Sequence, residues 1–278
     1  MDIISFENFK WHFFEKGEHD LDGVNLKIRK GEFVGITGPT GSGKTALCYV
    51  IMGVIPHLSN GKVISGRVLV DGLDITQHSV GELASHVGII LQSPKSQLTG
   101  AGLSIEEEIA FGLENNGVPR KEMKRRIKEV LMKTGLYKLR KRSPFEVSGG
   151  QQQKVAIASV LVLQPEILIL DEPTGYLDPE GTEAVFNLVK DLNKEGKTII
   201  LVTHKLEYLS EFADRVILFN NGKVIKDGRP DEVLGDYNLL VKNKLTPLPV
   251  TTLGKELKWR NYPITVRDAV RELRRELK

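Results

Sequence analysis

A glycine-rich loop between a short apolar run and a helical pattern constrains the fold of this 278-residue chain more than any other feature. The apolar run is Glu32–Thr37, and the helical pattern is Lys44–Met52. The loop consists of Gly38, Pro39, Thr40, Gly41, Ser42, Gly43, Lys44 and Thr45. It matches the pattern G-x-x-x-x-G-K-[ST], whose backbone N–H groups curl around phosphates. Lys44 can reach the β- and γ-phosphate oxygens, Thr45 offers a hydroxyl to Mg²⁺, and the helix directs its positive end at the anion.

Strand-type and helical patterns alternate along most of the chain. Further strand-type runs are Arg67–Val70, Val87–Leu91, Ile167–Leu170, Thr198–Thr203 and Arg215–Phe219. Helical patterns at Gly181–Leu192 and Lys205–Phe212 separate several of them, which predicts an α/β fold with a largely parallel sheet. Residues 103–163 read as helices only, with Pro119 at the first position of a helix over Pro119–Met132, so we expect a helical lobe there.

Composition excludes several classes of protein. Thirty-nine Lys and Arg against 36 Asp and Glu leave a net charge of +3, which gives no reason to expect nucleic-acid binding. The single cysteine, Cys48, lies among apolar neighbours and is predicted to be a buried, inert thiol, compatible with a reducing cytosol. Acidic residues within Met1–Phe14 argue against a secretory signal, and no apolar stretch reaches the length of a membrane span.

An acidic pair follows the apolar run that ends at Leu170. Ligands bind at the carboxyl ends of parallel strands, so Asp171 is predicted to hold Mg²⁺ through water, and Glu172 to orient and deprotonate an attacking water. Gln92 and His204 also follow strand-type runs. Alone, His204 is better explained as a structural or solvated histidine and Gln92 as a polar strand end, although an amide at Gln92 could ligate Mg²⁺ or hold the water.

A second phosphate-seeking helix start is predicted at Val147–Gln152. Ser148 can cap the helix that follows, and Gly149 and Gly150 allow a phosphate to approach its N-terminus. One glycine-rich loop already serves one triphosphate. A two-fold dimer, in which each subunit's Ser-Gly-Gly end caps the ATP held by the other subunit, would give this second site a role.

Together these motifs resemble the nucleotide-binding subunits of ABC transporters over about Ile3–Asp236. In chain order they are the Walker A loop Gly38–Thr45, the glutamine loop at Gln92, the signature Val147–Gln151, the Walker B motif Ile167–Glu172, the D-loop Gly175–Asp178 and the switch His204. The resemblance implies a P-loop NTPase fold, with a RecA-like core, an antiparallel β edge region and a helical subdomain. It also implies ATP and Mg²⁺ as ligands, and a head-to-tail dimer that closes on ATP binding and reopens after hydrolysis.

The resemblance also assigns roles to single residues. Phe13 matches the aromatic residue that stacks on adenine, with Trp11 as the weaker candidate. His204 would sense the γ-phosphate, and Asp178 would link the two sites across the dimer. The residues that complete the opposite site would be Ser148, Gly149, Gly150 and Gln151. The departures from the family pattern are Val147 for leucine, Lys154 for arginine and the bulky Tyr176 in the D-loop. None of them removes a catalytic group.

Within that family, Gln92–Gln97 and Ile105–Asn115 look like the energy-coupling factor (ECF) type of vitamin and metal importer. Such importers combine two related ATPases, as a homo- or heterodimer, with a transmembrane coupling subunit and a substrate-binding membrane subunit. This implies a peripheral protein on the cytoplasmic face of the membrane. It also implies an ATPase domain over 1–240 (core 1–92 and 164–240, helical subdomain 93–163) and a C-terminal extension over 241–278 that can serve dimerisation. The alternative is a soluble non-transport ABC ATPase acting on DNA or ribosomes.

Two further segments allow two interpretations each. Leu245–Val250 reads as a linker, followed by apolar positions at helical spacing. These positions are Val266, Ala269, Val270, Leu273 and Leu277. They form either a terminal helix packed on its own domain or a partner surface. A basic cluster on the Pro119–Met132 helix is either a solvated face or a weak attraction to anionic lipid. The cluster comprises Arg120, Lys121, Lys124, Arg125, Arg126 and Lys128.

Overall fold

The first strands of the chain form a four-stranded antiparallel sheet in the order β2-β1-β4-β5. Its strands are β1 (Asp2–Phe13), β2 (Leu21–Arg29), β4 (Gly61–Val70) and β5 (Leu73–Asp74). Phe6, Phe9 and Trp11 lie on its buried face. This sheet is the antiparallel β edge region that the family resemblance implies.

The computed structural model describes residues 1–14, 21–175 and 177–276. They form two compact units, the first comprising 1–80 and 200–278 and the second 81–199. In the first unit, β3 (Phe33–Thr37) lies parallel to β9 (Arg215–Asn220), and β10 (Lys223–Gly228) is antiparallel to β9. β8 (Thr198–Val202) is the strand along which the chain passes from the second unit into the first.

In the second unit, β6 (Val87–Ile90) pairs in parallel with β7 (Ile167–Asp171). Every residue of β3, β7 and β8 is buried, as expected for strands that are covered on both faces. The structure therefore confirms the predicted α/β fold with a largely parallel sheet.

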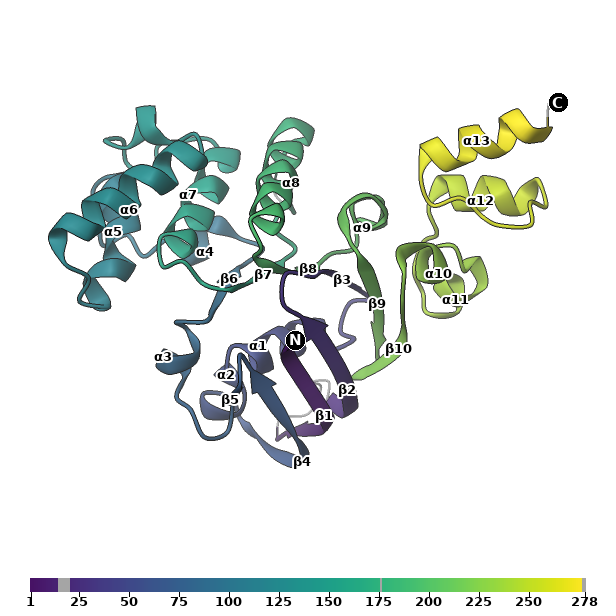
Figure 1. Cartoon of the computed structure of the whole chain (residues 1–278), viewed down its shortest axis with the longest axis horizontal. Coiled ribbons are helices and arrows are strands. Elements are labelled where there is room, and N and C mark those ends of the chain that lie inside the picture. The colour runs from purple at the N-terminus through teal and green to yellow at the C-terminus, as the bar shows by residue number, and fades with distance from the viewer. Residues whose placement is uncertain (15–20, 176, 277–278) are drawn as a thin grey trace. The chain divides into compact units, whose positions relative to one another are not determined.

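Helices follow or cover these strands (Figure 1). Those of the first unit are α1 (Lys44–Ile51), α2 (Val54–His57), α9 (Leu206–Phe212), α10 (Pro230–Leu234), α11 (Tyr237–Lys242), α12 (Pro249–Glu256) and α13 (Val266–Glu276). The helices between residues 80 and 199 are α3 (Val80–Leu83), α4 (Pro94–Gln97), α5 (Ile105–Asn115), α6 (Arg120–Lys133), the 3₁₀ helix η1 (Tyr137–Leu139), α7 (Gly149–Leu161) and α8 (Pro179–Lys194). Among the described residues, no helix is both long enough and apolar enough to cross a bilayer.

Two sequence-based boundaries are corrected by the structure. Pro119 is the N-cap of α6 rather than its first residue. Part of the predicted linker Leu245–Val250 is helical, because Pro249 begins α12. The fixed φ of proline suits the first turn of a helix, where the missing N–H has no partner to lose, so a proline-containing stretch can start a helix as readily as it forms a linker. Cys48 is fully buried in α1, as predicted.

The C-terminal helices have a small apolar cluster of their own. Trp259, Ile264 and Ala269 are buried, and the Thr251 hydroxyl donates a hydrogen bond to the Pro263 carbonyl at 2.8 Å. On α13, in contrast, an apolar stripe is exposed at Val266, Val270 and Leu273. The helix thus packs through one side while an apolar stripe stays open, so both interpretations of this segment remain. Leu277 lies outside the described residues.

The basic cluster on α6 is partly neutralised by its own helix. Arg125 bonds to Glu122 and Glu129, and Arg126 bonds to Glu122. Hydrogen bonds from Arg125 and then Arg126 lower the pKa of Glu122 to about 2. Such i,i+3 and i,i+4 pairs are typical of a solvated helix face, which favours that interpretation over attraction to lipid.

Candidate nucleotide-binding site

The glycine-rich loop of the first unit begins against the end of β9. Gly38 has a φ of +155°, a conformation that side chains rarely adopt. A Cβ atom at this position would overlap the carbonyl oxygen of Phe219 and lie 2.9 Å from its carbonyl carbon. Glycine is therefore required here for two reasons, the backbone angle and the absence of space.

Lys44 lies over the curled loop with its side chain 7% exposed. Its Nζ donates hydrogen bonds to the carbonyl oxygens of Gly38 and Pro39, both at 2.8 Å, and to the Ser42 hydroxyl at 3.3 Å. The ammonium is thus held within the loop, the place from which it can meet phosphate oxygens. Thr45 is exposed in the first turn of α1.

The turn between β9 and β10 supports the loop from a distant part of the sequence. The Gly222 N–H donates to the Ser42 carbonyl at 2.9 Å, and the Gly222 carbonyl accepts from the Asp22 N–H at 3.0 Å. A Cβ at Gly43 would lie 3.2 Å from the Phe219 ring, so the ring also contacts the loop. Sequence reasoning missed this support, because no motif marks a contact between residues about 180 positions apart.

The two aromatic candidates for adenine stacking differ in exposure. Trp11 is fully buried, so its ring is not available to a ligand. Phe13 is partly exposed and packs edge-on against Trp11, with the ring centroids 5.8 Å apart. Phe13 therefore remains the predicted adenine contact.

His204 lies at the same end of the first unit's parallel strands as the glycine-rich loop. The N–H of its neighbour Thr203 donates to the Ile36 carbonyl at 3.1 Å, two residues before Gly38. The His204 side chain is exposed. This placement fits the predicted contact with a bound phosphate.

In the second unit, Gln92 and the acidic pair come to one edge of the sheet. Ile90 of β6 is level with Leu170 of β7, so the residues that follow both strands emerge together. Asp171 is 9% exposed, and Glu172 adopts a left-handed φ of +48°, an uncommon conformation that recurs at active sites. The Gln92 side chain lies against Gly175, where a Cβ would be 3.0 Å from Nε2.

The start of α7 forms a capping box. The Ser148 hydroxyl accepts from the Gln151 N–H at 3.4 Å, and the Gln151 side-chain oxygen accepts from the Ser148 N–H at 3.1 Å. These bonds leave the first N–H groups of Gly149 and Gly150 at the helix end, as an anion site needs. The N-terminus of α8 is close by, since a Cβ at Gly150 would lie 3.8 Å from the Cα of Gly181.

Asp178 is the N-cap of α8, and its Oδ1 accepts from the Gly181 N–H at 2.7 Å. The structure therefore brings the signature motif and Asp178 together in the second unit. Tyr176, the bulky departure from the family pattern in the D-loop, lies outside the described residues.

The oxygen donors of these motifs fit magnesium. The described residues contain no group of three or more His, Cys, Asp or Glu side chains that could hold a metal ion alone. Mg²⁺ is commonly held by one or two protein ligands together with substrate phosphates and water. In the second unit the Asp171 carboxylate and the Gln92 amide oxygen are donors of that kind, and in the first unit the Thr45 hydroxyl is another.

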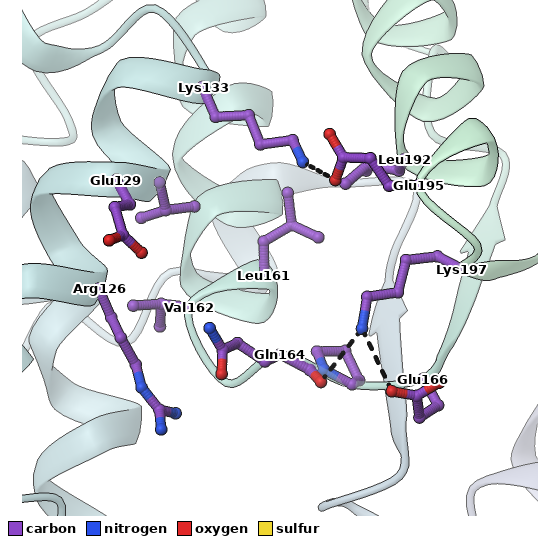
Figure 2. Close-up of a pocket in the computed structure, with 12 residues that line it drawn as sticks. Arg126, Glu129, Lys133, Leu161, Val162, Gln164, Glu166, Leu192, Glu195 and Lys197 are labelled. Carbon is purple, nitrogen blue, oxygen red and sulfur yellow. Dashed lines mark hydrogen bonds and ion pairs between the residues drawn. The ribbon is translucent and has the colours of Figure 1, made fainter. Parts of the chain in front are cut away.

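A charged cavity elsewhere in the second unit takes no part in this site (Figure 2). It has a volume of about 440 Å³ and lies beside α6 and the loop before β7. Lys133 forms an ion pair with Glu195, while Lys197 pairs with Glu166 at 3.6 Å. Its lining includes none of the predicted site residues, and its paired charges offer no net attraction for phosphate.

Comparison with known proteins identifies the family. Residues 21–175 match the family model described as "ABC transporter", which covers more than half of the chain. The chain belongs to the ABC transporter family. It is an ATP-binding subunit of the ATP-hydrolysing ABC type, as the ordered motifs predict.

Three related proteins refine this assignment. The energy-coupling factor transporter ATP-binding protein EcfA2 of Clostridium tetani is 41% identical over 91% of this chain and 88% of its own length. CbiO1 of Clostridium perfringens, described as part of the ABC transporter complex CbiONQ, is 33% identical with a TM-score of 0.76, over 92% of this chain and 99% of its own. The cassette MJ0796, solved as a dimer with ADP and Pi, is 30% identical with a TM-score of 0.69, over 82% of this chain and 98% of its own.

Proposed function

We propose that this ATPase powers an ECF-type importer of vitamins or metal ions from the cytoplasmic face of the membrane. The likeness to EcfA2 extends over 91% of the chain and that to CbiO1 over 92%, so both include the segment after Gln92. The partners would be a related ABC ATPase, a transmembrane coupling subunit and a substrate-binding membrane subunit. The transported compound would be set by the last of these.

The observation that carries this proposal furthest is that the phosphate loop, Gln92, the acidic pair and His204 each follow the carboxyl end of a strand. In the proposed cycle, Lys44 and Thr45 would hold the phosphates and Mg²⁺, Asp171 would hold Mg²⁺ through water, and Gln92 would supply an amide oxygen to it. Glu172 then activates the water, and His204 contacts the γ-phosphate. Hydrolysis transfers the γ-phosphoryl group to water, releases ADP and phosphate, and allows the dimer to reopen.

The opposite subunit would complete each site. Its Ser148, Gly149, Gly150 and Gln151 would meet the γ-phosphate, with Asp178 joining the two sites. The preformed capping box supports this, because the helix end is already ordered within one chain. The dimer of MJ0796 with ADP and Pi provides a precedent in the family.

A groove on the helical part of the second unit fits a helix of the coupling subunit. It lies between α5 and α6 and has a volume of about 770 Å³. Ala110, Met123 and Ile127 give it an apolar floor. Carboxylates line it from α5 and basic residues from α6, namely Glu106, Glu107, Glu114, Arg120, Lys124 and Lys128. We expect Ile127→Glu to release the ATPase from its membrane complex with little loss of ATP binding, whereas Met132→Glu, on an exposed position of the same helix, should not.

The Glu172→Gln variant tests the catalytic assignment. It should bind ATP, lose turnover by at least a hundredfold and accumulate as an ATP-bound dimer, because a neutral amide cannot accept the proton of the attacking water. Phosphate release and size-exclusion chromatography measure the two effects. Glu180→Gln, an exposed position in the first turn of α8, is the matched control. Hydrolysis by Glu172→Gln at the rate of the unchanged protein would refute the assignment.

Cell fractionation distinguishes the transport proposal from the alternative of a soluble ABC ATPase acting on DNA or ribosomes. A tagged chain should sediment with membranes and copurify with a hydrophobic subunit. Recovery with ribosomes or DNA alone would overturn the transport proposal. The subunit composition of the trapped dimer distinguishes a second copy of this chain from a paralogue.

A further inference from the structure

The side chain of Gln97 pairs with the backbone at the end of β6. Its Oε1 accepts a hydrogen bond from the Leu91 N–H at 3.0 Å, and its Nε2 donates to the Ile89 carbonyl at 2.7 Å. These two groups belong to alternate residues, the spacing at which a neighbouring strand would pair. β6 is the last strand in its sheet order, so the amide of Gln97 takes the place of a further strand at this free edge.

This clamp closes a short loop that contains Gln92. Leu91, whose N–H donates to Gln97, directly precedes Gln92. The short helix α4 reverses the direction of the chain, so that Gln97 lies beside β6. Pro94 is buried within α4, and the Ser96 hydroxyl bonds to the Ser93 carbonyl at 2.8 Å. These hydrogen bonds therefore restrain the backbone of Gln92.

Gly175 limits the Gln92 side chain from the other side. A Cβ at Gly175 would lie 3.0 Å from Nε2 and 3.3 Å from Cγ of Gln92, so the amide lies in a notch that a larger residue would narrow. Gly175 follows Glu172 by three residues. The clamp and the notch together hold the amide of Gln92 beside the segment that carries the proposed catalytic base.

The far end of the loop is tied to α5 by a buried carboxylate. Glu108 is 2% exposed, and its oxygens accept from the Thr99 N–H at 2.6 Å and the Gly100 N–H at 3.1 Å. Leu98, also buried, is the single residue between Gln97 and Thr99. Because Glu108 binds the backbone only two residues after Gln97, a displacement of the first turn of α5 would also move Gln97, and with it the backbone of Gln92.

We propose that Gln97 is a positioning residue for ATP hydrolysis, whose bidentate clamp on β6 sets the place of Gln92. This rests on the proposed function, because it takes Gln92 to act on Mg²⁺ or the attacking water. The two hydrogen bonds of the Gln97 side chain join it to the backbone of its own chain and not to a ligand. Losing the clamp would let the loop sample several conformations, and the cost of ordering it again would lower kcat by about tenfold.

Steady-state ATP hydrolysis by the complete ATPase, in its membrane complex, tests this inference. The variants are Gln92→Ala, Gln97→Ala and the double variant, with Lys95→Ala on an exposed position of α4 as the control. We expect Gln97→Ala to lower kcat about tenfold while KM for ATP stays within about twofold, since the phosphate loop is untouched. The double variant should be no slower than Gln92→Ala, because a misplaced Gln92 and an absent one have the same effect.

A merely structural role would produce a different pattern. It would lower the melting temperature and multiply the two kcat losses in the double variant, and that result would overturn the inference, as would a Gln97→Ala kcat equal to that of the unchanged protein. Should Gln97→Ala fail to fold, Gln97→Glu keeps the bond from Leu91 but places an oxygen against the Ile89 carbonyl, and it should show the same drop in kcat. Full activity of Gln92→Ala would instead contradict the role of Gln92 within the proposed function.

Discussion

Replacing Gly38 by alanine tests how the phosphate loop is seated. The added methyl group would overlap the carbonyl oxygen of Phe219, which belongs to the backbone of a buried strand and cannot turn aside. It would also impose a side chain on a φ of +155°. The start of the loop must therefore move away from β9, and the hydrogen bonds of Lys44 to Gly38 and Pro39 must change with it.

The structure provides a matched substitution that separates these two effects. Gly72, in the turn between β4 and β5, has a φ of +82°, and a Cβ there meets nothing within 4 Å. Gly72→Ala should cost the backbone strain alone, about 1–2 kcal/mol. Gly38→Ala adds the overlap, which for a forced methyl group in a packed site costs about 1–3 kcal/mol, for a total of about 2–5 kcal/mol.

Thermal unfolding and nucleotide binding measure both terms. At roughly 2–4 °C for each kcal/mol, Gly72→Ala should melt a few degrees lower and Gly38→Ala roughly 10 °C lower than the unchanged protein. Gly72→Ala should retain ATP affinity, and Gly38→Ala should lose at least about tenfold, since its phosphate-binding N–H groups are displaced. If Gly38→Ala melts and binds ATP like Gly72→Ala, then the contact with Phe219 does not seat the loop.

Two further substitutions follow from the structure. Gly175→Ala should push the exposed Gln92 amide aside and lower kcat severalfold with a stability change under about 0.5 kcal/mol; unchanged hydrolysis would show that the notch has no role. Glu122 has a pKa of about 2 in the folded chain against an ordinary 4.5, so its ion pairs stabilise the fold above pH 4.5 and are lost as the pH falls through about 2. Glu122→Gln should therefore lower the melting temperature slightly at pH 7 and at low salt, with the difference vanishing near pH 2; a difference independent of pH would contradict this origin.

The sequence predicts local elements well where one pattern determines them. The expected strand Glu32–Thr37 is β3, Phe33–Thr37, and the expected helix Lys44–Met52 is α1, Lys44–Ile51. Both follow from a short buried run and a helix start that a motif marks. The C-terminal linker shows the opposite case, because proline is compatible with either outcome and tertiary packing decides between them.

The supports of the site could not be predicted in this way. The seat of Gly38 depends on Phe219, and the clamp of Gln97 depends on the free edge of β6. A side-chain amide that pairs with a strand edge produces no periodic pattern in the sequence. A packing contact between distant segments produces no fixed spacing of residues either. Motifs in this chain identify the residues proposed to meet the ligand, whereas the residues that hold them in place emerge only from the fold.

The burial of Cys48 has a practical consequence for following this ATPase in motion. It is the only cysteine of the chain, and it lies fully buried in α1, out of reach of reagents that attack an exposed thiolate. A cysteine introduced at an exposed position such as Lys95 would then be the single reactive group. A fluorophore or spin label could be attached there with the native helix behind the phosphate loop left intact, so that movements of α4 during turnover can be recorded on an otherwise unmodified protein.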